Sequence, residues 1–173
     1  SDLERVLREI KKEVDDVKRL IRELNERNRT IVEEVKKLIE KLNRDNERIV
    51  REVKKRGDEK LVEEVVRTMK KSNDELRKIV EEVARRAKRS NEELEKIVRE
   101  VVRRVKELLK EVREGEEVKR IEDEVRKLVR ELEELLKRSD DDTERLVEEL
   151  KELLKRSEKK TRELAKELRD RRR

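Results

Sequence analysis

Residues 21–59 read IRELNERNRTIVEEVKKLIEKLNRDNERIVREVKKRGDE, and this stretch decides the fold class. Its apolar residues recur at spacings of three and four, which is the pattern of one face of an α-helix. The pattern has an 18-residue period, as Ile21 with Ile39 and Val32 with Val50 illustrate. Because an α-helix has about 3.6 residues per turn, an 18-residue period is a whole number of turns, so the apolar stripe runs straight along the helix and little supercoil is expected.

The only two glycines of the sequence, Gly57 and Gly115, divide the rest of the chain into residues 1–56, 58–114 and 116–173. None of the three parts contains another helix breaker, because the chain has no proline. Glycine is the residue with which a helix most readily ends in the left-handed conformation. Basic residues precede Gly57, where they would lie at the negative C-terminal end of the first helix dipole. Asp58 follows Gly57 and is a candidate N-cap of the next helix.

The sequence therefore predicts an all-α fold, a straight antiparallel up-down-up three-helix bundle with helices of about 55 residues and a single domain over residues 1–173. Each helix has an apolar arc of roughly 120–140°, which lets three helices close on one another. The arcs of the first two helices are slightly wider, which leaves room for a weak groove between them without requiring one. The predicted helices are residues 2–56, 58–114 and 116–170, with turns at Gly57 and Gly115.

The composition excludes most enzyme classes. Of the 173 residues 59% are charged and 31% hydrophobic, and the chain lacks aromatic residues, histidine and cysteine. There is therefore no imidazole or thiol for catalysis, no disulfide and no ordinary zinc site. The apolar runs are too short for a membrane span or a signal peptide. The net charge of +6 is a small excess on a nearly balanced surface, so we expect no nucleic-acid interface and interpret residues 171–173, all arginine, as a frayed terminus.

Uncharged polar residues replace apolar ones at several positions of the stripe. Asn25 and Asn43 stand at the repeat position of Leu7. In two antiparallel helices, the residue numbers of any two residues that face each other add up to the same value. The numbers of Asn25 and Asn91 add up to the same value as those of Asn43 and Asn73, so both pairs are expected to face each other. The six polar pairs therefore assemble into two layers, and the equivalent third layer is apolar. The first layer comprises Asn25, Asn28, Ser90, Asn91, Ser139 and Thr143, and the second layer comprises Asn43, Asn46, Ser72, Asn73, Ser157 and Thr161.

These layers are expected to specify how the helices pair. An unpaired buried polar group costs about 1–3 kcal/mol, whereas Asn together with Ser or Thr supplies matching donors and acceptors. A shifted register or a reversed helix would bury these groups against leucine, so the layers favour one register. The alternative interpretation is a small polar binding site, but neither layer contains an ionisable catalytic group.

The 18-residue units, the absence of aromatic residues, the surface rich in Glu, Lys and Arg and the repeated Asn/Ser layers resemble de novo designed helical bundles with modular buried hydrogen-bond networks. The resemblance implies a synthetic, soluble, monomeric scaffold, cytoplasmic on recombinant expression. Such a scaffold is not an enzyme and needs no cofactor, metal, membrane, nucleic acid or partner. The resemblance equally allows a subunit or cage of a designed assembly or switch, which docks a partner helix or a second copy. A natural spectrin-like coiled coil is a further alternative, although its repeats are less regular.

Residues 140–142 are three consecutive aspartates. They lack the spacing and the glycine of an EF-hand loop, so the sequence favours a solvated face over a cation site. The same run could end one helix and cap another. The 18-residue phase nevertheless persists from Val125 through Thr143 to Thr161, which predicts one continuous helix.

Overall fold

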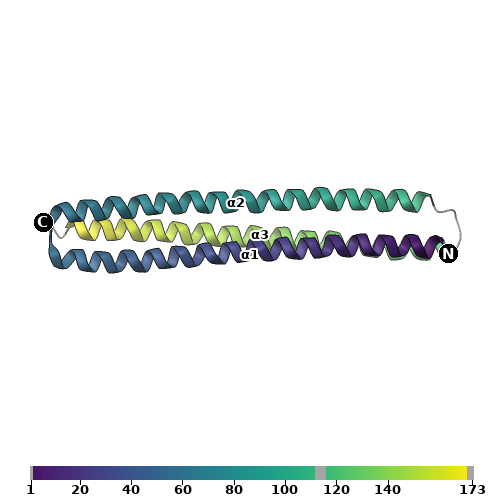
Figure 1. Ribbon diagram of the computed structural model, residues 1–173, viewed down its shortest axis with the longest axis horizontal. Coiled ribbons are helices and arrows are strands. Elements are labelled where there is room, and N and C mark those ends of the chain that lie inside the picture. Colours follow the sequence, from purple (N-terminus) through teal and green to yellow (C-terminus); the bar gives the residue numbers. More distant parts are fainter. Residues whose placement is uncertain (1, 112–115, 171–173) are drawn as a thin grey trace. The chain divides into compact units, whose positions relative to one another are not determined.

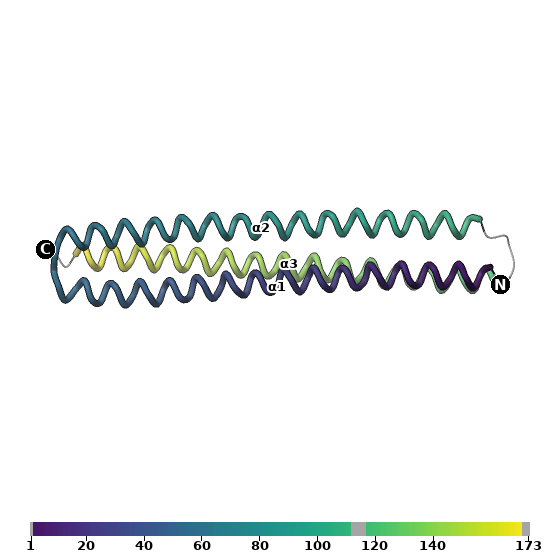
Figure 2. Tube along the Cα trace, viewed as in Figure 1, coloured from purple at the N-terminus to yellow at the C-terminus, as the bar shows by residue number. Residues whose placement is uncertain are grey.

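The computed structural model of the protein describes residues 2–111 and 116–170 and places three α-helices there, which confirms the predicted fold class. They are α1 (Asp2–Arg56), α2 (Glu59–Lys110) and α3 (Glu116–Asp170) (Figure 1). α3 is continuous through residues 139–143 and has no second N-terminus there (Figure 2). The predicted second helix extended to about residue 114, whereas α2 ends at Lys110. The predicted turn at Gly115 and the arginines at 171–173 lie outside the described residues.

The turn between α1 and α2 has the chemistry that the sequence predicts. Gly57 has a φ of 63°, and its N–H donates to the carbonyl oxygen of Val53 at 3.1 Å. The backbone N–H of Lys60 donates to Oδ1 of Asp58 at 3.0 Å, so Asp58 caps the first turn of α2. A side chain at position 57 would strain this backbone conformation, which glycine adopts freely.

The described chain forms two compact units, and each helix contributes a segment to both. Unit 1 contains residues 2–28, 87–111 and 116–144, and unit 2 contains residues 29–86 and 145–170. Within each unit the segments of α1, α2 and α3 lie side by side (Figure 1). The single domain over residues 1–173 stays a prediction.

Each unit has its own hydrophobic core, which comes from the apolar stripes of all three helices. In unit 1 the core includes Ile10 of α1, Leu94 of α2 and Leu132 of α3. Unit 2 has two clusters, and the residues of the second layer fall between them in the sequence of every helix. One cluster is built around Ile39 and Leu150. The apolar stripes of the three helices therefore pack against one another and form the cores, as the 18-residue repeat implies.

Ion pairs along the α1–α3 edge show that these helices run parallel within each unit. In unit 1 Lys11 pairs with Glu124 at 3.6 Å and Lys18 pairs with Glu131 at 3.0 Å, and in unit 2 Lys36 pairs with Glu149 at 3.0 Å. Lys54 pairs with Glu167 at the same sequence offset. Such partly exposed pairs each contribute at most about 1 kcal/mol. These ion pairs show which residues of α1 and α3 face each other, but they contribute little to the free energy of folding.

Candidate functional site

The second layer, in unit 2, contains a hydrogen bond between helices. Ser157 of α3 is fully buried, and its Oγ donates to Oδ1 of Asn43 of α1 at 2.7 Å. Thr161 Oγ1 donates to the backbone carbonyl oxygen of Ser157 at 3.0 Å. The structure thus brings together three of the six residues predicted for this layer: Asn43, Ser157 and Thr161.

Two further amides complete the buried part of the second layer. Asn46 and Asn73 are 4% and 6% exposed, and Ser72 is half-buried. Nδ2 of Asn46 and Oδ1 of Asn73 have no hydrogen-bond partner among the described residues. One is a donor and the other an acceptor, so the unused groups of the layer are complementary in kind.

The first layer, in unit 1, has more unpaired atoms than the second. Ser139 and Thr143 are 3% and 4% exposed, and neither hydroxyl has a partner in the described part of the chain. The four residues that α1 and α2 contribute are half-buried, and three of their amide atoms are also unpaired. These residues are Asn25, Asn28, Ser90 and Asn91. The structure thus places all six at partly or fully buried positions but connects them less than the second layer.

The α2–α3 edge differs between the two units at positions related by the 18-residue repeat. In unit 2, Arg77 Nη2 donates to both carboxylate oxygens of Glu158, at 2.6 and 2.7 Å. The hydrogen bond with Glu158 and its charge raise the pKa of Arg77 above its usual value. The counterparts of these two residues in the 18-residue repeat are Glu95 and Asp140 in unit 1, so two carboxyl groups replace the ion pair.

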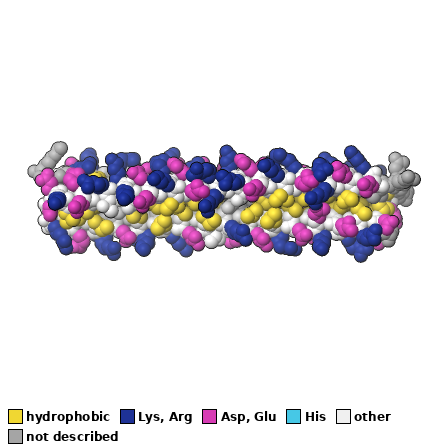
Figure 3. All heavy atoms as spheres, turned by 45° about the horizontal axis from the view of Figure 1, so that its top comes forward, with side chains coloured by type: hydrophobic (Ala, Val, Ile, Leu, Met, Phe, Trp, Pro, Cys, Tyr) yellow, Lys and Arg dark blue, Asp and Glu magenta, His cyan; other side chains and the backbone are white. Residues whose placement is uncertain are grey.

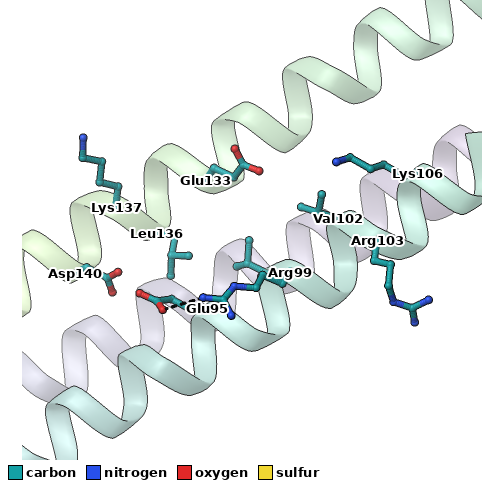
Figure 4. A pocket seen from close by; sticks show the side chains of 10 residues that line it. Glu95, Arg99, Val102, Arg103, Lys106, Glu133, Leu136, Lys137 and Asp140 are labelled. Atoms are coloured by element: carbon teal, nitrogen blue, oxygen red, sulfur yellow. Dashed lines mark ion pairs between the residues drawn. The ribbon is translucent and has the colours of Figure 1, made fainter.

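The two carboxyl groups line an open groove of about 540 Å³ between α2 and α3 of unit 1 (Figure 4). Desolvation, followed by the hydrogen bond with Glu95 and its negative charge, raises the pKa of Asp140 from 3.8 to about 6. A smaller contribution comes from the charge of Asp141. Glu95 also pairs with Arg99, whose Nη2 lies 3.6 Å from Oε2 of Glu95. Asp140 therefore keeps its proton in weakly acidic solution.

The sequence interpretation of residues 140–142 as a solvated face is wrong for Asp140. Asp141 is exposed and Asp142 is half-buried, whereas Asp140 is half-buried with its Oδ1 inaccessible to solvent. Sequence reasoning also missed Glu95 as the opposing group. The sequence contained a signal for this pair, because the residue numbers of Glu95 and Asp140 add up to the same value as those of Arg77 and Glu158, which face each other in unit 2.

The chemistry of these sites is limited to hydrogen bonding and to the exchange of one proton. The layers hold amides and hydroxyls, which donate and accept hydrogen bonds but do not titrate near neutral pH. In residues 2–111 and 116–170 no group of three or more acidic side chains is placed to hold a metal ion. No described helix is long and apolar enough to cross a membrane.

The fold and its buried residues define an all-α protein with three-helix packing and uncharged polar groups in its core. No protein-family model and no curated protein matches the sequence. Among solved structures, the chain is similar to a protein described as a computationally designed three helix bundle. The two are 20% identical, with coverage of 98% of this chain and 87% of the other, and the TM-score is 0.44.

Proposed function

We propose that this protein is a designed structural scaffold without natural biochemical activity, and that its two Asn/Ser/Thr layers fix the register of its helices. The observation that carries the proposal is the partly buried hydrogen bond from Ser157 to Asn43. It joins α1 to α3 through two uncharged groups, and a slip of one helix would leave both without a partner at a cost of about 1–3 kcal/mol.

The chemistry of the chain supports the same role. Uncharged polar residues occur in the core of both units, and the groups that could catalyse a reaction are confined to carboxylates, lysines and hydroxyls. A scaffold of this kind needs no cofactor and is a monomer. Designed origin accounts for the regularity of the 18-residue repeat and for the restricted set of residue types.

The proposal is tested by replacing Asn28 and Asn46, singly, with leucine. Each variant is expected to stay helical but to populate more than one register, because leucine at this position no longer penalises a slip that brings it against the apolar residues of a neighbouring helix. Two-dimensional NMR would show extra amide signals, and light scattering after size exclusion would show departure from the monomer mass of 21.2 kDa.

The matched control is Ile10→Asn, because Ile10 is the apolar counterpart of Asn28 and Asn46 in the repeat and is fully buried. A lone amide at this position is expected to lower the free energy of unfolding by about 1–3 kcal/mol or more. If both leucine variants became more stable and kept a single monodisperse state, the register-fixing role would be refuted.

A second candidate function is that of a subunit that docks another helix. The observation that favours it is a set of exposed apolar side chains on α1 and α2.

A further inference from the structure

The first layer, in unit 1, contains five polar atoms that are inaccessible to solvent and have no hydrogen-bond partner in the described part of the chain. Buried polar groups in proteins are nearly always paired, either with other protein groups or with ordered water. Bulk solvent does not reach these atoms, so it does not satisfy them. Asn28 Nδ2, Ser139 Oγ and Thr143 Oγ1 are donors, and Asn25 Oδ1 and Asn91 Oδ1 are acceptors.

A difference in helix register does not explain why these atoms are unpaired. The α1–α3 ion pairs of both units join residues 113 positions apart. The two helices therefore pair with the same offset in each unit, and Ser139 stands opposite Asn25 as Ser157 stands opposite Asn43. Only Ser157 and Asn43 form a direct hydrogen bond, so the cause lies in the side chains of the first layer.

The threonines of the two layers also use their hydroxyl groups differently. Thr161 Oγ1 donates to the backbone carbonyl oxygen of Ser157, one turn earlier in α3. Thr143 has the carbonyl group of Ser139 at the same spacing, but its hydroxyl has no partner among the described residues. A hydroxyl that is not bonded to its own helix is available to another group in the layer.

One residue beside the layer differs in size between the units. Ala87 of α2 stands one turn before Asn91 and is 3% exposed. It is expected to face Thr143, because the antiparallel register that aligns the layer also aligns these two residues. Its 18-residue counterpart is Met69, which faces Thr161 in the same way and is 2% exposed. The methionine side chain continues past the β-carbon, where alanine stops, so Met69 fills volume that Ala87 leaves free.

The burial of the neighbouring amides indicates that the helices do not close over Ala87. If they did, the asparagines of the first layer would be at least as buried as those of the second. Asn28 and Asn91 are instead half-buried, whereas their counterparts Asn46 and Asn73 are 4% and 6% exposed. The volume beside Ala87 is therefore kept, and unpaired polar atoms border it.

From this arrangement we infer that the first layer is a binding site for an ordered water molecule, which lies beside Ala87 and joins side chains of all three helices. A buried water typically makes about two to four hydrogen bonds. This water donates to the two unpaired amide oxygens and accepts from two of the three donors. One donor is surplus, so loss of the Ser139 hydroxyl leaves the bonds of the water complete.

The chemistry of the layer selects a neutral ligand. Its six residues are amides and hydroxyls, and charged side chains lie along the surface on the face drawn in Figure 3. An ion in the layer would lose its hydration without gaining an opposite charge, which is costly. A water molecule both donates and accepts, as the mixture of unpaired donors and acceptors requires. This inference goes beyond the scaffold role and does not depend on the register-fixing role of the layers.

The test uses the full chain, with water itself as the probe. Oxygen-17 relaxation dispersion of the solvent signal has an amplitude proportional to the number of water molecules that the protein holds for long times. Ala87→Met recreates the unit 2 arrangement and is expected to reduce this amplitude by that of one water. Met69→Ala opens the equivalent position in the second layer and is expected to increase it by the same amount. The exposed control Leu38→Ala should leave it unchanged.

Circular dichroism and two-dimensional NMR show which variants keep the helical fold, and a variant that does not fold leaves the decision to the reciprocal one. An unchanged amplitude in either folded variant, or no long-lived water in the parent chain, would overturn the inference. In crystals of the parent chain, the water is expected within about 2.7–3.2 Å of Oδ1 of Asn25 and Asn91. A crystal structure with direct side-chain bonds at these oxygens would also contradict it. None of these results would bear on the register of the helices.

Discussion

The two units are built from the same three helices and the same 18-residue repeat, yet they use equivalent positions in opposite ways. Unit 2 has the Arg77–Glu158 ion pair at its α2–α3 edge and the Ser157–Asn43 hydrogen bond in its polar layer. Unit 1 places Glu95 opposite Asp140 at the equivalent edge. A repeat can therefore fix the backbone arrangement while a few substitutions within it set the local energetics.

The largest expected effect tests what the two units share. Leu132 in unit 1 and Leu150 in unit 2 are 18-residue counterparts, and both are fully buried. Alanine at either position is expected to lower the free energy of unfolding by about 2–5 kcal/mol, because it removes apolar contacts and leaves a cavity. Guanidinium denaturation measures this, with Leu38→Ala at an exposed position as the control. A loss below about 1 kcal/mol in only one unit would show that the cores are not equivalent.

The next effect should differ in direction between the units. Ser157→Ala removes the donor to Asn43 and is expected to lower the free energy of unfolding by about 1–2 kcal/mol. Ser139→Ala, its counterpart, removes a buried hydroxyl without a partner among the described residues and should leave stability unchanged or raise it by up to about 1 kcal/mol. Thermal and chemical denaturation of the two variants make the comparison. Equal losses would mean that the first layer is as fully bonded as the second.

A smaller effect depends on pH. Because the folded-state pKa of Asp140 is raised to about 6 from 3.8, the folded chain binds this proton more tightly than the unfolded chain. The resulting stabilisation is fully present below about pH 4 and is lost as the pH rises through about 6. For a half-buried, solvent-screened carboxyl we expect about 1 kcal/mol between pH 4 and 7.

Two variants isolate this contribution from that of the other carboxylates. Asp140→Asn should remove this part of the pH dependence, and Glu95→Arg should do so by recreating the Arg77–Glu158 pair of unit 2. Differences in unfolding free energy from the parent chain are compared at each pH. Unchanged pH profiles in both variants would contradict the assignment to the Glu95–Asp140 pair.

The smallest effect concerns the ion pairs that the units have in common. Lys18→Met and Lys36→Met each remove one α1–α3 pair with an N–O distance of 3.0 Å. Each is expected to lower the free energy of unfolding by about 0.2–1 kcal/mol, and the loss should disappear in about 0.5 M salt. A larger, salt-resistant loss in one variant would show that burial of the lysine stem, and not charge, dominates in that unit.

The fold could be predicted from the sequence because a periodic stripe specifies both helix and core. Gly57 and Asp58 marked the end of α1 and the cap of α2, and the constant sums of residue numbers assigned Ser157 and Asn43 to one layer without predicting the hydrogen bond between them. The polar positions followed from breaks in the stripe. Sequence reasoning missed the Glu95–Asp140 pair because a charged residue on the border of a stripe looks solvated until the opposing helix is considered. The hydrogen bonds inside each layer depend on side-chain rotamers, which periodicity does not encode.

The central claim, that the layers fix the register, is tested most directly by one measurement on unit 2. Spin labels on cysteines at the exposed positions of Lys37 and Glu152 report the distance between α1 and α3. We compare the parent chain with a variant whose second layer carries the residues of the equivalent apolar layer, and read the width of the distance distribution by double electron–electron resonance. Its substitutions, which follow Leu7, Ile10, Leu108, Leu109, Ile121 and Val125, are Asn43→Leu, Asn46→Ile, Ser72→Leu, Asn73→Leu, Ser157→Ile and Thr161→Val. A single narrow distance in the parent and a broadened or multiple one in the variant would support the claim. The same narrow distance in both would contradict it.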